Sequence, residues 1–430
     1  MKAVVKRILR SGWSGTEILL IFVEIISYFY SIKWLVDIYG RMFIHHKSKF
    51  SVLMTYLSLE ASTFQRPDRL SRTASILVNR AENQEADLFG NQDLLESFIL
   101  LVSYSGDCYL LHRMLGVMRT RVDMDALAKL IEGILKFSKN KIGWINEFSE
   151  SGSAYRNKFV EGNEKSPLMR FSQNYHYEDE YWPSLKAAIR PFVDSNEYRI
   201  DESITVLVSC DYSYFEIFSK YFCKRIRKKN SHKILFFVVA RDLEEVSKIV
   251  TFARQLERYG DIEVHPKIGV HDEYEHDVGL GLLASVQRFI DANDVMKKRK
   301  TSVLILDIDL DSNFSIQALV RGLKNDVSFA VDSAAVVPWG RYSAGICYFK
   351  YSSISLTFLL LVKVYIQFAL NERGEWTLDQ TAAAVVIDYL ERNDYKIEIS
   401  DTGLSNARRR TIKVPFYLKL RKYNAKRLNT

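Results

Sequence analysis

Three aspartates at alternate positions follow a short apolar segment in the second half of this 430-residue chain. The segment 302–306 reads SVLIL, and Asp307, Asp309 and Asp311 come directly after it. In open α/β sheets ligands bind where the strands end, and alternation along an extended chain places the three carboxylates on one side. Crowded carboxylates repel one another unless a cation lies between them, and a hard divalent ion accepts oxygen ligands from carboxylates and substrate phosphates. The pattern therefore predicts a site for Mn²⁺ or Mg²⁺ formed by Asp307, Asp309 and Asp311.

The same aspartates allow two other interpretations. They can begin a turn and cap a helix near Asn313, without any role in chemistry. Alternatively, Asp307 is the nucleophile of a phosphatase similar to the haloacid dehalogenase type, in which the motif follows the first strand of the domain. Three candidate strands precede the strand that leads to Asp307 in this chain, and this position argues against the phosphatase.

The segments around the motif alternate between strand and helix patterns. Continuous apolar runs predict strands at 204–208, 233–240, 262–264 and 302–306, and helical periodicity predicts helices at 214–227 and 242–259. Such strands, separated by amphipathic helices, are typical of a parallel sheet that helices cover on both faces. We therefore predict an α/β domain over residues 199–430.

The first part of the chain has a different pattern. Apolar residues recur there at helical spacing, as in Leu94, Phe98 and Leu101, so we predict an all-helical domain over residues 1–150, either a hairpin bundle or a solenoid-like stack. Residues 151–198 contain three prolines and the acidic, aromatic stretch YHYEDEYWP. This change in composition predicts a connecting region between two domains.

The basic charge of the chain is concentrated at one end. The formal net charge is +8, but nine of the 60 basic residues lie in 402–430, which holds no acidic residue. The remainder has 51 basic and 52 acidic residues, so the composition does not support a distributed nucleic-acid-binding face. We expect no nucleic-acid partner, and we expect the tail to contact phosphate, either on a ligand or on an anionic lipid surface.

Two segments are apolar enough to be considered as membrane-spanning helices. Glu24 interrupts 18–32 and Lys363 interrupts 355–370, which leaves each uncharged run far short of the roughly 20 residues that a span requires. Both segments are therefore predicted as buried helices. The four cysteines lie far apart, which suggests neither a zinc cluster nor a disulfide framework. We expect a protein that is cytoplasmic or peripheral to the inner face of the membrane, through the basic tail or an N-terminal helix.

Four further segments carry a resemblance to a known family. They are ITVLVSCD at 204–211 followed by Tyr214, LLASVQRFI at 282–290, YSAGICYF at 342–349 and WTLDQ at 376–380. In order and spacing, these segments and the DxD pattern resemble nucleotide-sugar glycosyltransferases of the GT-A fold, similar to family 8, over residues 198–422. The resemblance implies a Rossmann-like GT-A domain behind the helical one, and a role in polysaccharide or glycan synthesis.

The resemblance also implies roles for particular residues. Sugar would move from a nucleoside-diphosphate donor, UDP-sugar most of all, to a hydroxyl of a glycan, polysaccharide or protein. Asp379 would be the base if the enzyme inverts, and Gln380 or Asp379 would lie on the reactive face of the sugar if it retains configuration. The expected donor-binding residues are Asp211, Tyr214, Arg288, Asp307, Ser343, Gly345, Trp376, Arg408 and Arg410.

The sequence departs from the family pattern at two points. Ser343 stands where the family usually has asparagine, and the last histidine is His276, so the usual histidine ligand to the metal has no counterpart. Asp311 is the candidate third ligand, and the basic cluster 408–410 is expected to neutralise the diphosphate. Two alternatives stay open: a non-catalytic nucleotide- or glycan-binding protein with a degenerate GT-A domain, and a nucleotidyltransferase of related fold.

Overall fold

The structure is a computed structural model of the chain. The described residues are 74–75, 78–79, 81–83, 99, 102–103, 107–121, 124–158, 172–189, 203–269, 279–310, 313–332, 335, 337–372, 374–375, 377–395 and 397–403. The predicted site residues Asp311, Trp376, Arg408 and Arg410 lie outside these ranges, as do the apolar segment 18–32 and the basic tail.

The chain divides into two compact units. The first comprises Met1–Met124 with Asn163–Leu168, and the second comprises Asp125–Gly162 with Met169–Thr430. The first unit contains helix α8 (Cys108–Arg119), which begins at Asp107 because that carboxylate accepts hydrogen bonds from two free backbone amides of the first turn. Its five buried residues lie along one helical face, as the apolar periodicity of this part of the chain predicts.

The second unit begins earlier than the predicted domain boundary near residue 150. Its first two helices are α9 (Asp125–Ser138) and α10 (Trp144–Lys158). The reason is aromatic packing: Phe148 of α10 stacks on Tyr175 with ring centroids 4.8 Å apart and meets Trp339 edge-on at 5.6 Å. Burial of such large rings joins this helical hairpin to the residues that follow it.

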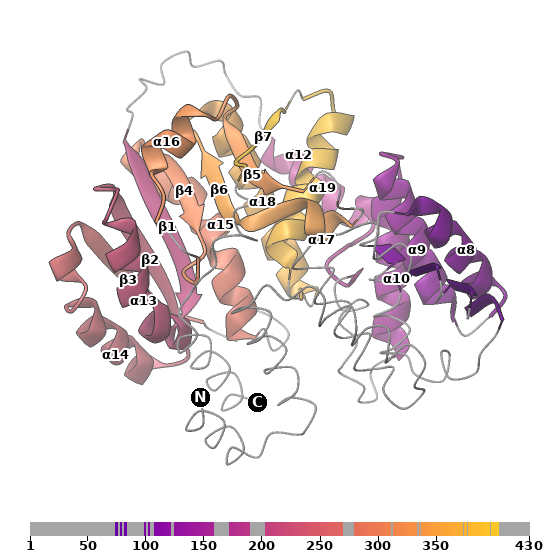
Figure 1. Ribbon diagram of the computed structural model, residues 1–430, viewed down its shortest axis with the longest axis horizontal. Coiled ribbons are helices and arrows are strands. Elements are labelled where there is room, and N and C mark those ends of the chain that lie inside the picture. Colours follow the sequence, from indigo (N-terminus) through magenta and orange to yellow (C-terminus); the bar gives the residue numbers. More distant parts are fainter. Residues whose placement is uncertain are drawn as a thin grey trace, which may run out of the picture. The chain divides into compact units, whose positions relative to one another are not determined.

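One mixed sheet forms the centre of the second unit (Figure 1), with the strand order β3-β2-β1-β4-β6-β5-β7. The strands are β1 (Ile204–Asp211), β2 (Lys233–Ala240), β3 (Ile262–Ile268), β4 (Ser302–Leu306), β5 (Val327–Val331), β6 (Tyr342–Phe349) and β7 (Ile399–Asp401). Strands β1 to β4 are parallel, and β6 runs antiparallel between β4 and β5. All four strands predicted from the apolar runs are present.

The strand order reverses between β1 and β4. From β1 the chain moves outward to β2 and β3, and it then returns to form β4 on the other side of β1. In open α/β sheets the crevice at such a reversal, outside the carboxyl ends of the strands, is where ligands bind. Asp211 is the last residue of β1 and Asp307 directly follows β4, so both predicted site residues lie at this edge.

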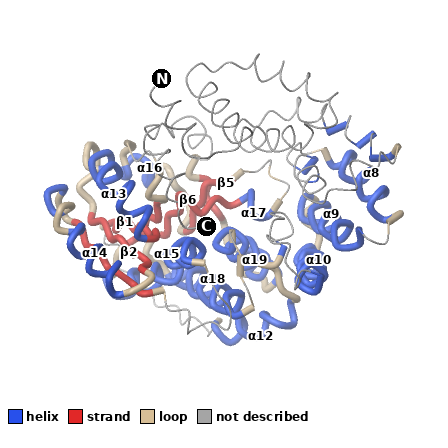
Figure 2. Tube along the Cα trace, turned by 90° about the horizontal axis from the view of Figure 1, so that it is seen from below, coloured by secondary structure: helices blue, strands red, loops and turns tan. Residues whose placement is uncertain are grey.

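Helices cover both faces of the sheet. The helices described after residue 171 are α12 (Glu178–Ala188), α13 (Tyr212–Ile226), α14 (Leu243–Ala253), η3 (Glu257–Tyr259), α15 (Leu280–Arg299), α16 (Ile316–Arg321), α17 (Pro338–Arg341), α18 (Ser353–Asn371) and α19 (Leu378–Arg392). Figure 2 shows α13 and α16 on one side of the sheet and α15 and α18 on the other. The predicted α/β layering is therefore observed.

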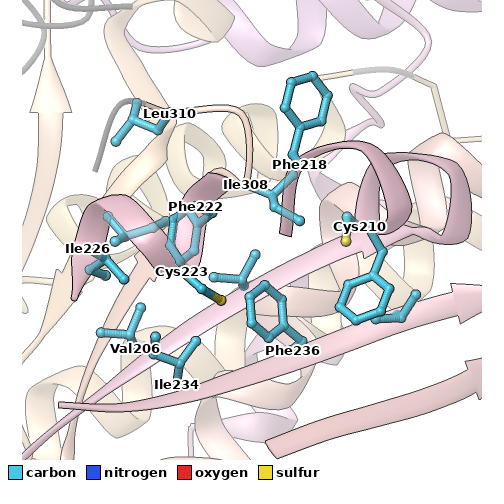
Figure 3. Close-up of a cluster of buried hydrophobic side chains, with 14 of the residues drawn as sticks. Val206, Cys210, Phe218, Phe222, Cys223, Ile226, Ile234, Phe236, Ile308 and Leu310 are labelled. Carbon is cyan, nitrogen blue, oxygen red and sulfur yellow. The ribbon is translucent and has the colours of Figure 1, made fainter. Parts of the chain in front are cut away.

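The core between α13 and the sheet is densely apolar (Figure 3). Phe218 and Phe222 of α13 pack over Val206 of β1 and Phe236 of β2, and all four side chains are at most 1% exposed. Side chains alternate along β1, so Val206, Val208 and Cys210 point to this face of the sheet. The residues between them, including Ser209, point to the opposite face, which α15 covers.

The predicted buried helix at 355–370 is observed as α18. Ten of its residues are buried, and it contacts α12, α15 and α19. Among the described helices, α18 alone is long and apolar enough to cross a membrane, and 56% of its most apolar window is buried inside the protein.

Candidate functional site

The aspartate motif lies in a turn that an apolar core holds in place. Strand β4 ends at Leu306, and the amide of Leu310 donates to the carbonyl of Asp307 at 3.2 Å. Ile308 and Leu310 are 3% and 5% exposed and belong to the core under α13 (Figure 3). The extended geometry that would align three carboxylates therefore stops after the strand. Asp307 and Asp309 are half-buried in the turn that follows.

A single guanidinium connects two of the predicted motifs. Arg288 of α15 donates through one terminal nitrogen to Oδ1 of Asp307, and through the other to Oδ2 of Asp379 at 2.7 Å. Arg288 is 6% exposed and Asp379, in the first turn of α19, is 3% exposed. Three residues from separate parts of the sequence thus form one buried ion-pair group at the carboxyl end of β4. The sequence predicted all three.

Burial and charge act in opposite directions on this group. Burial alone would lower the pKa of Arg288, but the carboxylates of Asp307 and Asp379 raise that pKa above its ordinary value. Burial raises the pKa of Asp379, and the charge and hydrogen bond of Arg288 counteract this effect. Arg288 is therefore a permanent cation. It supplies part of the positive charge that the crowded carboxylates require.

The end of β1 lies near the second aspartate of the motif. Burial raises the pKa of the Cys210 thiol well above its ordinary value, and the charges of Asp211 and Asp309 raise it further. Asp211 is the N-cap of α13 and accepts a hydrogen bond from the amide of Tyr214 at 2.8 Å. Asp211 and Tyr214, two of the predicted donor-binding residues, thus lie at the start of a helix at the strand-order reversal, where free backbone amides are also found.

Ser209 is a site candidate that the sequence analysis missed. It is 7% exposed, and no described group forms a hydrogen bond with its hydroxyl. The register pairs Leu207 of β1 with Ile305 of β4, and Ser209, two residues further along β1, lies on the same α15 face near the carboxyl end of the strand. The signal in the sequence is a hydroxyl residue inside the apolar run ITVLVSCD.

The glycine strand contacts the motif through its backbone. The amide of Asp307 donates to the carbonyl of Gly345 in β6 at 2.9 Å. Next to this contact the pairing of β6 with β5 shifts: Phe329 pairs with Cys347, but Ala330 pairs with Ser343. The three residues between them form a bulge, a feature common beside active sites. Ser343 and Gly345 thus lie within or next to an irregular segment that adjoins Asp307.

The start of α19 has an unusual backbone. Thr377, its N-cap, has φ 78° and ψ 6°, the left-handed region that β-branched residues avoid. Gln380 is half-buried, and its backbone amide donates a hydrogen bond to Oδ1 of Asp379 at 2.9 Å. This hydrogen bond fixes one oxygen of Asp379, while Arg288 binds the other.

The described residues do not complete a metal site. No group of three His, Cys, Asp or Glu side chains in the described ranges is arranged to hold a metal ion. Asp307 and Asp309 supply two carboxylates, and the third predicted ligand, Asp311, lies outside those ranges.

Comparisons with known proteins give only distant similarity. No protein-family model and no curated protein matches the chain. Solved structures that it resembles include the bifunctional glycosyltransferase WbbM (10% identity, TM-score 0.29, covering 52% of each chain). They also include the glycosyltransferase GlyE of Streptococcus pneumoniae (17% identity, TM-score 0.29, covering 50% of this chain and 52% of that one). A third is mouse xyloside xylosyltransferase 1 (10% identity, TM-score 0.30, covering 50% and 94%).

The match spans about half the length of WbbM and GlyE. All three similar structures are glycosyltransferases by name. Their TM-scores are too low to bear on the mechanism of this chain, so the function must be inferred from its own site.

Proposed function

We propose that this protein is a metal-dependent glycosyltransferase with a GT-A-like domain. It transfers a sugar from a nucleoside-diphosphate donor, with UDP-sugar as the first choice, to a hydroxyl of a glycan, polysaccharide or protein acceptor. One observation carries the proposal: buried Arg288 joins Asp307 of the DxD motif to Asp379 of the WxxDQ motif. Segments that resemble one family in sequence thus meet at the edge of the sheet where ligands bind.

The charge of the site indicates how a diphosphate would bind. Asp307, Asp309 and Asp379 contribute three carboxylates and Arg288 one cation, so a bare diphosphate would meet net negative charge. Mg²⁺-like ions use one or two carboxylates together with substrate phosphates and water, which fits Asp307 and Asp309. When bound there, such an ion would neutralise the leaving diphosphate. Arg408 and Arg410 are proposed to add cationic contacts to the same group.

Asp379 is the proposed proton acceptor if the reaction inverts configuration. Burial raises its pKa, and a carboxylate with a raised pKa is better suited to take a proton from a hydroxyl near neutral pH. Arg288 keeps it oriented through Oδ2. If configuration is retained, Asp379 or Gln380 would face the sugar, and the leaving phosphate would take the proton.

Calorimetric binding of UDP, GDP and their sugar conjugates, each with and without Mn²⁺, tests the proposal. We expect binding that requires both nucleotide and metal, and we expect Asp307→Ala with Asp309→Ala to abolish it. A matched control is Asp261→Asn with Asp326→Asn, because these aspartates precede β3 and β5 and so lie at the opposite edge of the sheet. Equal losses in both double variants would contradict the proposed site.

Product analysis separates the remaining functions. A glycosyltransferase releases a nucleoside diphosphate when it hydrolyses its donor slowly in the absence of acceptor. Release of pyrophosphate would identify a nucleotidyltransferase instead. Metal-dependent nucleotide binding without any turnover, across donors and candidate acceptors, would indicate a non-catalytic binding protein.

A further inference from the structure

The turn into α19 holds a threonine in a conformation that threonine disfavours. The φ of Thr377 is 78°, and a β-branched side chain rarely adopts such an angle without outside support. The carbonyl of Thr377 accepts hydrogen bonds from the amides of Gln380 and Thr381 at 3.0 and 2.9 Å. The first turn of α19 is therefore built on this residue. The backbone conformation of Thr377 thus sets the direction in which the side chain of Asp379 points.

Asn174 bonds this turn on both sides of residue 376. Its side-chain oxygen accepts from the amide of Glu375 at 2.6 Å, and its side-chain nitrogen contacts the hydroxyl of Thr377 at 3.4 Å. Asn174 is completely buried. A primary amide supplies one acceptor and two donors from a single planar group, so one side chain can hold both the backbone and the side chain of the turn.

The segment that carries Asn174 is itself fixed within the second unit. The hydroxyl of Tyr365 in α18 donates to the carbonyl of Asn174 at 2.8 Å. The neighbouring Tyr175 is fully buried, and its hydroxyl lies 3.4 Å from the hydroxyl of Thr381 in α19. These contacts hold Asn174 in place, and Asn174 in turn restrains the turn at the start of α19.

We propose that Asn174 is a positioning residue for the reaction: it holds Thr377 in its left-handed conformation and so sets Asp379 against Arg288. This inference rests on the proposed role of Asp379. It also assigns part of the site to the segment ahead of α12, which the sequence analysis assigned to a connecting region.

Three variants test the proposal: Asn174→Ala, Asn174→Asp, and Asn174→Ala combined with Thr377→Gly. Hydrogen–deuterium exchange of the amides in 374–381 measures the restraint on the turn, and kcat and KM for donor hydrolysis measure its effect on the site. For Asn174→Ala we expect faster exchange and a kcat reduced by about 10- to 100-fold, because small displacements of catalytic groups have effects of that size. The donor KM should change little.

The double variant Asn174→Ala with Thr377→Gly distinguishes a positioning role of Asn174 from a general contribution to packing. Glycine adopts positive φ without a steric penalty, so Thr377→Gly should restore both exchange protection and kcat to Asn174→Ala. Asn174→Asp keeps the acceptor for Glu375, and its second oxygen can accept from the hydroxyl of Thr377. It also places a carboxylate at a fully buried position, so we expect an effect between those of the wild type and Asn174→Ala. Asn293→Ala is the matched control, because Asn293 is also buried and bonds Leu356 at 2.7 Å in another part of the unit.

Unchanged exchange in Asn174→Ala would overturn the proposal, and so would a lost kcat that Thr377→Gly fails to restore. Rescue of Asn293→Ala by the same glycine would also overturn it, because the effect would then be general stabilisation. If the wild type turns over no donor, the proposed function fails. In that case the exchange measurements still decide whether Asn174 holds the turn.

Discussion

At the scale of single residues, Arg288 determines the electrostatics of the candidate site. It is buried with Asp307 and Asp379, and a buried charge without a partner is far more costly than a buried pair. One guanidinium binds carboxylates from the end of β4 and from α19. Displacement of either carboxylate would therefore break an ion pair with Arg288. The group is a preorganised part of the site, to which any ligand must adapt.

Replacement of Arg288 by methionine should destabilise the protein in a pH-dependent way. Removal of one member of a buried ion pair costs about 3–5 kcal/mol of unfolding free energy. Burial already raises the pKa of Asp379, and loss of Arg288 raises it further. The folded variant then binds a proton more tightly than the unfolded chain, so its stability falls as pH rises through that pKa. Urea unfolding should show a larger deficit at pH 8 than at pH 5.

Arg299→Met is the matched control on the same helix. Arg299 bonds Glu263 at 2.6 Å and is 29% exposed, and Glu263 keeps its second partner Lys233. The expected loss is about 0–1 kcal/mol. Equal deficits for the two arginine variants, or a deficit of Arg288→Met that is independent of pH, would contradict the buried pairing.

Some site residues could be predicted from the sequence and others could not. Arg288, Asp307 and Asp379 stand in segments with recognisable patterns, and the structure places them in direct contact. Asn174 had no such signal, because its role depends on a contact with residues about 200 positions away in the chain. The residues next to Asn174 in the sequence do not indicate which distant residues it contacts in the folded protein. The N-cap role of Asp211 was not predicted either, because the family resemblance assigned this residue to donor binding.

At the scale of elements, the turn after β4 is held by its apolar residues. Ile308 lies between Asp307 and Asp309 in sequence, and its side chain enters the core between α13 and the sheet. The apolar residues of the turn are buried in this core, whereas Asp307 and Asp309 are half-buried. The positions of the carboxylates should depend on the fit of Ile308 in that core.

Ile308→Val should weaken metal-dependent nucleotide binding as well as stability. Loss of one buried methylene from isoleucine costs about 0.5–1.5 kcal/mol. Ile234→Val is the control, since Ile234 is 1% exposed in the same core but lies at the start of β2, away from the turn. Both variants should lose similar unfolding free energy, measured by denaturant titration. Nucleotide affinity measured by calorimetry should fall only for Ile308→Val, and equal affinities would exclude an anchoring role.

The strands show where an apolar sequence pattern is sufficient to predict a strand and its bounds, and where it is not. β1, β2 and β4 are continuous apolar runs, and their bounds are close to those predicted. β3 continues past the predicted 262–264 to Ile268 and includes Pro266. An edge strand tolerates proline, and no other described strand pairs with the outer side of β3. β7 is three residues long and exists because it pairs with β5. Such a strand has no pattern of its own that a sequence could display.

At the scale of the whole molecule, polar contacts join distant parts of the second unit. The indole nitrogen of Trp144 in α10 donates to Asp388 of α19 at 2.9 Å. Arg392 of α19 bonds both Asp388 at 2.6 Å and Glu178 of α12 at 2.5 Å. Sequence composition predicted a domain boundary between these elements. Their contacts instead make the helical hairpin part of the same compact unit as the sheet.

Asp388→Asn should change how stability depends on pH. Burial raises the pKa of Asp388 to about 6, despite Arg392 and the hydrogen bond from Trp144. Because this folded-state pKa is above the ordinary value of 3.8, the contribution of Asp388 is present in acid and is lost as pH rises through about 6. The variant cannot titrate there. Its stability relative to wild type should therefore rise by about 2 kcal/mol between pH 4.5 and 7.5.

Urea unfolding at a series of pH values, followed by circular dichroism, measures this difference. Trp144→Phe provides an independent check, because loss of the indole donor removes a group that lowers the pKa of Asp388. In that variant the decline should therefore continue to a higher pH than in the wild type. Parallel stability curves for wild type and Asp388→Asn would mean that Asp388 is exposed to water in solution. The contact between α10 and α19 would then fail to form as described, and the helical hairpin would be only loosely attached to the sheet.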